Sequence, residues 1–563
     1  MADYGIRINA NLQTWWTPPY ELTEQDWRKL DAAIYLSHRA GVIHRAGLFI
    51  GQNVAVDDAL LERQARFTAA FAARYRQAEG LIYYLNGDYQ LRPQSPEQQQ
   101  LAWQLAQTRH WNERLTGAIR SVDPRHPIVS EYYQNPSGGL DVRQTLDGLD
   151  MAEIGYFDQP DRDLSRFPAV FKMTDHRLRG KSAAVGEFGV KTHPAWEPSL
   201  GGGGYHIRRS VEQQNRLFLT LPQLTFGLGG ATARNWCWRD DDDRIFPWGL
   251  THTCDGVPRD ALRYYRAAAL LLLRLQPRWT KPEVVLVASD SSRRTVNDGF
   301  SPYDLAAADL LARLGVDFAV VSDLDLREGD LRGVKAAFVP GATVSDTAAQ
   351  ILNSLEQAGS LTVCRQYPAA MADSPADQQA ESLILPLPEV RRRWADLLDR
   401  ARVARVQVRP DDPAIAVMPV ALQDGAAVVL VNTGDQTQRL QAAFPDGKSV
   451  EMSLSPWEPG LAAWNSAGGV LALEGGSVLS CDGRQVAESD GHILLWSVET
   501  PHDRDTDVRS AWDIFLVPTT ARNIHLMRAD DGFDTAEVGE FRRGSWHRLG
   551  EIPLRAAERG IQL

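Results

Sequence analysis

The first half of the chain alternates short apolar runs with longer stretches of helical periodicity. The short runs predict strands, which are Gly5–Asn9, Ala46–Ile50, Leu81–Leu85, Pro127–Glu131, Met151–Tyr156, Ser182–Glu187 and Gly230–Trp236. The stretches between them, such as Trp27–Ala40 and Leu61–Arg76, have the spacing of amphipathic helices. Strands that alternate with helices form a parallel sheet, and so many repeats favour a (β/α)8-type TIM barrel over an open sheet.

The predicted barrel is one strand short. Residues 1–280 contain seven such strands, whereas eight strands close a TIM barrel. The sequence enters its first strand at Gly5, almost at once. We therefore expect residues 5–9 to form an internal barrel strand, with the first β/α unit missing from the chain or supplied by another segment.

Two further regions follow the predicted barrel domain at 1–280. Residues 281–385 predict a small doubly wound α/β domain, with strands at Val284–Ala288, Phe318–Val321, Ala336–Val339 and Leu361–Val363 and helices at Tyr303–Leu314 and Thr347–Ala358. This region has no GxGxxG or GxxxxGK[ST] loop, so nothing in it indicates nucleotide binding. Residues 366–385 are polar and indicate a linker. Residues 386–563 begin with a helix near Glu389–Arg402 and continue as short β runs, which predict C-terminal all-β modules.

Composition narrows the class of protein. The chain has 563 residues, 44% apolar and 23% charged, which is typical of a globular protein. Its 60 Lys and Arg against 72 Asp and Glu give a formal charge of −12, which argues against nucleic acid or an anionic membrane as partner. The longest apolar run, Ala267–Leu273, is too short to span a bilayer. No signal peptide precedes the first strand, so we expect a cytoplasmic protein.

The cysteine pattern gives no indication of a metal or of disulfides. The four cysteines, Cys237, Cys254, Cys364 and Cys481, lie far apart in the sequence. The acidic run Asp240–Asp243 lacks the alternating ligand spacing of a calcium loop and is typical of a solvated loop. We assign no metal role to the loop histidines His193, His206 and His252, and we expect neither metal nor cofactor.

Candidate chemistry gathers at the carboxyl ends of the predicted strands, where the active sites of TIM barrels lie. These positions carry carboxylates and aromatic rings, at Trp15, Asn86, Asp88, Glu131, Tyr156, Glu187, Trp236 and Trp238. Two opposed carboxylates beneath aromatic walls are the minimum for glycoside hydrolysis, and a separation of about 5–5.5 Å allows the covalent route. Aromatic faces support the apolar face of a sugar ring.

Three segments resemble a known group of enzymes. Ala184-Val-Gly-Glu-Phe-Gly189 resembles the end of the seventh barrel strand of clan A glycoside hydrolases, where a glutamate is the nucleophile. Met1–Trp16 resembles the second strand of that clan, and Trp236 matches its eighth-strand tryptophan. Leu331–Val363 resembles the trimerisation domain of the family 42 β-galactosidases.

The resemblance implies a retaining β-glycoside hydrolase that acts on a β-galactoside or a related oligosaccharide. Glu187 would then be the nucleophile, while Asn86, Trp15, Glu131, Tyr156, Trp236 and Trp238 would bind the carbohydrate substrate. The resemblance also implies a homo-oligomer, with a trimer as the favoured state. Because Trp236 and Trp238 alternate along a strand, only one of the two is expected to face the substrate.

The fourth strand of the clan departs from this pattern. The clan has Asn-Glu there, with the glutamate as acid/base, but this chain has Asn86-Gly-Asp88-Tyr89. Alignment on the tyrosine makes Asp88 the acid, whereas alignment on the asparagine places Gly87 there and leaves no acid. Asp88 could instead cap the following helix, and Glu131 or Glu153 could be a barrel hydrogen-bond partner or the true acid. The alternative function is a catalytically inactive carbohydrate-binding or assembly subunit.

Overall fold

The described part of the chain covers most of the predicted elements. The computed structural model describes residues 8–11, 20–50, 54–87, 95–132, 145–158, 164–192, 207–239, 249–252, 256–294, 300–341, 343–365, 387–476, 478–489, 491–498, 511–515, 523–526, 535–542, 545–553 and 561–562. Trp15, Asp88, His193, His206 and the acidic run 240–243 lie outside these residues.

A parallel sheet forms the first part of the molecule, as predicted. Its strands follow chain order and are β1 (Ile8–Asn11), β2 (Ile43–Gly47), β3 (Leu81–Tyr84), β4 (Ile128–Tyr132), β5 (Met151–Phe157), β6 (Ser182–Gly189) and β7 (Gly230–Asn235). All six pairings between neighbouring strands are parallel. Within the described residues this sheet has seven strands, with β1 and β7 at its two ends. A strand is therefore found in each of the seven predicted regions.

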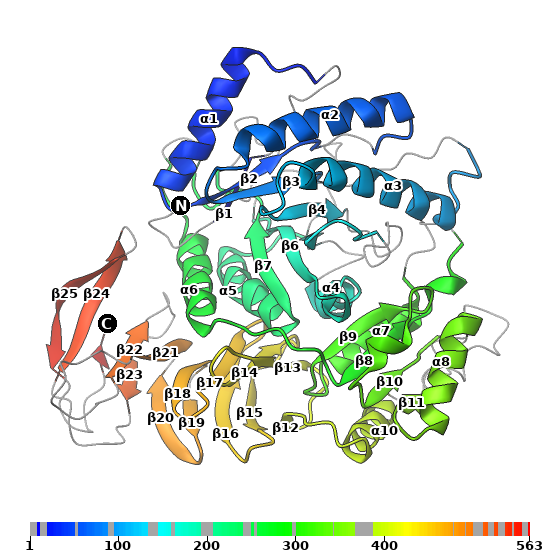
Figure 1. Ribbon diagram of the computed structural model, residues 1–563. Helices are drawn as coiled ribbons and strands as arrows, with labels where there is room; N and C mark the ends of the chain where they lie inside the picture. The colour runs from blue at the N-terminus through cyan, green and yellow to red at the C-terminus, as the bar shows by residue number, and fades with distance from the viewer. Residues whose placement is uncertain are drawn as a thin grey trace.

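Helices surround the outer face of this sheet (Figure 1). They are α1 (Glu24–Arg39), α2 (Asp58–Tyr75), α3 (Leu101–Arg120), α4 (Phe167–Lys172), α5 (Val211–Gly227) and α6 (Asp260–Leu275). Local signals set where several of them begin. The Thr23 hydroxyl accepts the Asp26 N–H while the Asp26 carboxylate accepts the Thr23 N–H, a capping box that starts α1. Ser210 and Gln213 form the same arrangement at α5.

The second strand differs from its prediction. The apolar run Ala46–Ile50 predicted a strand, but β2 begins at Ile43 and ends at Gly47. Leu48, Phe49 and Ile50 are buried beyond its end, so the apolar run marks core packing after the strand. Two polar residues of β2 are nevertheless buried, because each finds a partner. The His44 ring lies 3.2 Å from the Ser37 hydroxyl, and Arg45 pairs with Glu153.

The second part is a four-stranded parallel sheet in the order β11-β10-β8-β9. Its strands are β8 (Val284–Ala288), β9 (Phe318–Ser322), β10 (Ala336–Phe338) and β11 (Thr362–Cys364). The helices α7 (Pro302–Leu311), α8 (Asp346–Gln357) and α10 (Leu387–Arg400) complete it. The doubly wound α/β prediction is confirmed, and Cys364 is buried within the core.

The remaining residues form antiparallel sheets. One sheet has the order β12-β15-β16-β19-β20-β23-β26 and the other β13-β14-β17-β18-β21-β22. Their strands are β12 (Gln407–Arg409), β13 (Ile415–Ala421), β14 (Ala426–Asn432), β15 (Gln438–Ala443), β16 (Ser449–Leu454), β17 (Pro459–Trp464), β18 (Val470–Gly475), β19 (Val478–Cys481), β20 (Arg484–Ser489), β21 (Ile493–Val498), β22 (Ala511–Phe515), β23 (Asn523–Leu526) and β26 (Ile561–Gln562). A separate hairpin joins β24 (Thr535–Arg542) to β25 (Ser545–Pro553).

The three parts pack against one another. Helix α5 lies against β13, β14 and β17, and α4 lies against α7. One apolar core runs from the parallel sheet through the α/β sheet to the second antiparallel sheet. The domain boundaries near residues 280 and 385 stay predictions, since this shared core crosses both. Among the described residues, no helix is long and apolar enough to cross a membrane.

Candidate active site

A layer of charged side chains fills the inner face of the curled parallel sheet. Arg45 of β2 pairs with Glu153 of β5, and Arg234 of β7 binds Glu131 of β4 at 3.2 Å. Both contacts join strands that are not neighbours in the sheet, so these side chains meet across its concave face. Buried charges persist in proteins where they are paired, and this layer supplies the pairs.

Glu187 reaches this layer through a β-bulge. The β5–β6 register pairs Ile154 with Val185 and then Gly155 with Glu187, so Gly186 is the extra residue of β6. A Cβ at Gly186 would lie 2.5 Å from Glu131 Oε2 and 2.8 Å from Glu153 Oε2. The bulge therefore places Gly186 and Glu187 on the same inner face, and the missing side chain at 186 leaves room for the two buried carboxylates.

Arg234 stands between two carboxylates. Its Nη2 lies 3.2 Å from Glu131 Oε2 and 3.7 Å from Glu187 Oε1. The side chains of Glu187 and Arg234 are 14% and 13% exposed, whereas that of Glu131 is fully buried. Burial opposes the charge of Arg234, but Tyr84 and the carboxylates of Glu131 and Glu187 hold its pKa above the usual range. Glu187 and Arg234 thus form the outer, reachable edge of the layer.

Tyr84 is buried against the charged layer and contacts both Glu131 and Arg45. Its hydroxyl donates to Glu131 Oε2 at 2.6 Å, and the guanidinium carbon of Arg45 lies 3.7 Å from the centre of its ring. Burial, together with the negative charge of Glu131, raises the pKa of Tyr84 well above its usual value. Tyr84 is therefore a neutral donor to Glu131 and not a nucleophile.

The structure brings together only some of the residues expected to bind substrate. Glu131 and Glu187 meet in the charged layer, and Asn86 is buried at the end of β3, where its carbonyl accepts the Glu131 N–H at 2.8 Å. The Trp236 N–H donates to the Phe188 carbonyl at 2.7 Å, so Trp236 directly prolongs β7 beyond Arg234. By strand alternation Trp236 shares the side of Arg234, whereas Trp238 packs against the main apolar core.

Tyr156 does not fit its expected role. It is 1% exposed, and its ring packs edge to face on Phe167 at 5.1 Å, next to α4. On the same strand, Glu153 and Gly155 face the charged layer. Because successive side chains of a strand point to opposite faces, Tyr156 takes the face opposite to its neighbour Gly155. Tyr156 therefore stabilises the contact of β5 with its covering helix and does not line the site.

Gly87 bears on the question of the acid. A Cβ at Gly87 would lie 2.6 Å from the Tyr84 hydroxyl and 3.6 Å from Ile50 Cδ1. The Tyr84 hydroxyl thus fills the space that a side chain at position 87 would need, and a glutamate there would displace it. Asp88 lies outside the described residues, so its distance to Glu187 is not part of the structure described here.

The sequence interpretation missed three residues of the layer: Arg45, Tyr84 and Arg234. Arg45 and Arg234 lie inside their strands, and Tyr84 is the last residue of β3, within the apolar run, so a search of the residues after each run passes over all three. An arginine inside a short apolar run is the signal that was available, because a buried arginine requires a carboxylate partner. Among the described residues, no group of three or more side chains could hold a metal ion.

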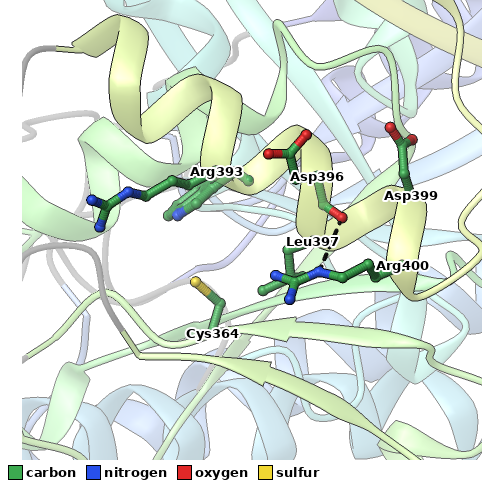
Figure 2. Close-up of a pocket in the computed structure, with 7 residues that line it drawn as sticks. Cys364, Arg393, Asp396, Leu397, Asp399 and Arg400 are labelled. Carbon is green, nitrogen blue, oxygen red and sulfur yellow. Dashed lines mark hydrogen bonds between the residues drawn. The ribbon is translucent and has the colours of Figure 1, made fainter.

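A separate hollow lies in the α/β part of the molecule and not at the barrel mouth (Figure 2). It has a volume of about 600 Å³ and lies between β11 and α10, lined by Cys364, Arg393, Trp394, Asp396, Leu397, Asp399 and Arg400. Two of its charged groups have partners outside the hollow, since Arg393 binds Glu389 at 2.5 Å and Asp399 binds Arg405 at 2.7 Å, and Arg400 donates to the Asp396 carbonyl at 3.4 Å (Figure 2). The candidate active site is therefore the charged layer of the parallel sheet.

Comparison with known proteins supports this fold. No protein-family model matches the sequence, and no curated protein matches it. Among solved structures, a cold-adapted β-galactosidase from Rahnella sp. R3 aligns over 82% of this chain and 94% of its own, with a TM-score of 0.62 and 13% identity. A β-galactosidase from Halorubrum lacusprofundi aligns over 84% and 96%, with a TM-score of 0.60 and 14% identity.

A third solved structure carries the family designation. The catalytic mutant of the family 42 β-galactosidase Gan42B from G. stearothermophilus aligns over 81% of this chain and 93% of its own, with a TM-score of 0.59 and 12% identity. Identities this low establish likeness of fold and leave activity open. The chain has the fold of a TIM-barrel glycosidase, similar in architecture to the family 42 β-galactosidases.

Proposed function

We propose that the protein is a retaining β-glycoside hydrolase that acts on a β-galactoside or a related oligosaccharide, with Glu187 as nucleophile. One observation carries the proposal. The bulge at Gly186 directs Glu187 onto the inner face at the reachable edge of the layer, while Glu131 and Glu153 are buried and paired with arginines. The names of the structural neighbours support the substrate class.

The proposed reaction has two steps. A carboxylate oxygen of Glu187 attacks the anomeric carbon while an acid protonates the departing glycosidic oxygen, which gives a covalent glycosyl-enzyme. The same acid, now a base, removes a proton from water, and the resulting hydroxide oxygen displaces Glu187 from the sugar. We assign the acid/base role to Asp88, and we propose that Asn86, Trp15 and Trp236 hold the sugar.

The variant Glu187→Gln tests the nucleophile. Glutamine is nearly isosteric but cannot attack the anomeric carbon, so turnover should fall by roughly 10⁴-fold or more, with an unchanged circular dichroism spectrum. A 2-fluoro glycoside, followed by mass spectrometry, should add one sugar to the peptide that contains Glu187 in the parent protein and none in the variant. Glu212→Gln, which changes an exposed carboxylate of α5, is the control and should keep full activity. Unchanged turnover in Glu187→Gln would remove Glu187 from the mechanism.

A second candidate function is carbohydrate binding without turnover. The observation that favours it is Gly87, because the Tyr84 hydroxyl already occupies the space that an acid at position 87 would need if the alignment on Asn86 holds. The same fluorinated glycoside separates the two proposals. Saturable binding by calorimetry without a covalent adduct or released sugar would support the binding module, and an adduct on Glu187 would support the enzyme.

We also propose that the chain forms a homo-oligomer through the α/β sheet region, with a trimer as the leading candidate. The proposal rests on the resemblance of Leu331–Val363 to a trimerisation domain. Multi-angle light scattering at micromolar concentration should give three times the chain mass of 62.6 kDa. A monomer under those conditions would reject the proposal.

A further inference from the structure

Arg234 is shared by two carboxylates that differ in burial. We propose that Arg234 is a positioning residue for Glu187: it ties the carboxylate of Glu187 to the buried Tyr84–Glu131 pair and keeps that carboxylate ionised and fixed in direction. The inference rests on the proposed function of Glu187 as nucleophile. Arg234 lies inside β7 and was not among the residues selected from the ends of the predicted strands.

Arg234 is itself held in place. Its Nη2 binds the fully buried Glu131 at 3.2 Å, and Glu131 is fixed in turn by the Tyr84 hydroxyl at 2.6 Å. The guanidinium carbon of Arg234 lies 5.9 Å from the centre of the Tyr84 ring, within reach of the attraction between a cation and an aromatic face. An arginine anchored in this way presents its remaining N–H groups in a fixed direction.

Charged groups from four strands surround Glu187. The described charged groups of the layer are Glu131 on β4, Glu153 on β5, Arg45 on β2 and Arg234 on β7, with neutral Tyr84 on β3. Arg45 is engaged by Glu153, and Arg234 lies 3.7 Å from Glu187 Oε1. A cation at this distance favours the charged form of a carboxyl group, whereas like charges disfavour it. Without Arg234, Glu187 would face the buried carboxylate of Glu131 without the cation that now lies between them.

The contact of Arg234 with two carboxylates matters when one of them loses its charge. When Glu187 forms its bond to the sugar, its negative charge is lost. An arginine paired with Glu187 alone would then be a nearly buried cation without a partner, which is costly. Because Arg234 keeps Glu131, its guanidinium stays paired in the glycosyl-enzyme and is in position when Glu187 regains its charge.

The experiment measures the titration of Glu187 directly. A diazo reagent that esterifies protonated carboxyl groups is applied across a pH series, and mass spectrometry follows the peptide that contains Glu187. In Arg234→Met the labelling midpoint should rise by about 1–3 pH units, because the nearby cation is lost. Arg234→Lys keeps the charge but lacks the rigid planar guanidinium, so its midpoint should rise less. This second variant preserves the test if Arg234→Met fails to fold.

The control is Arg120→Met, which breaks an arginine–carboxylate pair with Asp150, 2.5 Å apart, at the opposite end of the same sheet. Its labelling midpoint at Glu187 should equal that of the parent protein. The acidic limb of kcat/KM should move with the labelling midpoint in the Arg234 variants and stay unchanged in the control.

The two readouts separate the inference from the proposed function. A parent protein without turnover, combined with a raised midpoint in the Arg234 variants, would reject the hydrolase while leaving the positioning role in place. An active parent protein with the same midpoint in Arg234→Met, Arg234→Lys and the control would overturn the positioning role alone.

Discussion

Gly186 is the residue on which the placement of Glu187 depends most directly. A methyl group there would press against the buried carboxylates of Glu131 and Glu153, and overpacking of this kind costs about 1–3 kcal/mol. We expect Gly186→Ala to lower the free energy of unfolding in urea by that amount and to reduce turnover, because the bulge would shift. Gly117→Ala, at an exposed position of α3 with open space around it, should instead stabilise the protein by about 0.5–1 kcal/mol. Equal stability of the two variants would contradict the close approach at Gly186.

At this same scale, the sequence singled out residues at the ends of predicted strands and passed over residues inside them. The flanking glycines of Glu187 and its place at the end of the predicted strand 182–187 made it a candidate, although β6 continues to Gly189. Arg45 and Arg234 escaped because their partners lie on strands distant in sequence, and nothing local indicates such pairs. Tyr156 was misplaced because a strand end specifies the edge of the sheet, whereas the face depends on the register of a single residue.

At the scale of elements, a buried histidine connects α5 with the antiparallel sheets. His492 Nε2 lies 2.8 Å from Glu474 Oε1 of β18, and His492 Nδ1 lies 3.2 Å from Glu458 Oε1. Gln223 of α5 donates to the same Glu474 oxygen at 3.0 Å. Burial opposes the imidazolium, but the two carboxylates prevail and raise the pKa of His492 to about 10. Burial likewise opposes the Glu458 carboxylate, yet His492 lowers the pKa of Glu458 to about 2.

These shifts set a pH window for the contact. The His492 contribution to stability is complete below its unfolded pKa, near 6.5, and is lost as the pH rises through about 10. The Glu458 contribution is complete above 4.5 and is lost as the pH falls through about 2. Breaking a buried pair costs about 3–5 kcal/mol, so His492→Gln should show that loss at pH 6 and a smaller one at pH 10, measured by urea unfolding. His38→Gln, which removes an exposed pair with Glu79, should change stability by less than about 1 kcal/mol. A loss in His492→Gln that does not vary with pH would reject the charged pair.

The elements themselves were predictable where periodicity and burial coincide. Strands β8 to β11 appear in the sequence as isolated apolar runs because both faces of a parallel sheet are covered. The bounds of β2 were wrong because the apolar residues Leu48, Phe49 and Ile50 pack after the strand, while the strand itself contains His44 and Arg45. Apolar periodicity records burial, and burial continues past the end of a strand.

At the scale of the whole molecule, the order of the folded regions followed from the alternation of strands and helices, but their contacts did not. The sequence treated the three regions as separate units, and the structure shows one core that runs through all of them. Besides this shared apolar core, charged residues in loops and short helices join the regions. Their partners lie more than a hundred residues away, as with Arg177 and Asp317, so no local pattern could reveal them.

The junction between the parallel sheet and the α/β sheet contains a buried ion network. Asp175 binds Lys172 at 2.5 Å and Arg177 at 2.8 Å, and Arg177 also binds Asp317, just before β9, at 2.8 Å. Burial lowers the pKa of Lys172 to about 8. Because this value still lies above neutral pH, Lys172 is charged there and pairs with Asp175. Burial opposes the charge of Asp175, but Arg177 and Lys172 hold its pKa below the usual range.

Asp175 is therefore the residue whose loss should loosen this junction. Asp175→Asn would leave the buried Lys172 and the nearly buried Arg177 facing each other without the carboxylate between them. Removing one member of a buried ion network costs about 3–5 kcal/mol, which urea unfolding should detect. Hydrogen exchange should rise most in β9, whose Phe318 carbonyl accepts from Arg177, while β3 at the centre of the parallel sheet should change less. Asp325→Asn, which breaks the partly exposed pair of Arg109 and Asp325 across the same junction, should cost less than about 1 kcal/mol. If the two variants lost equal stability, or if exchange rose evenly over both sheets, the buried network would not be what holds the α/β sheet to the barrel.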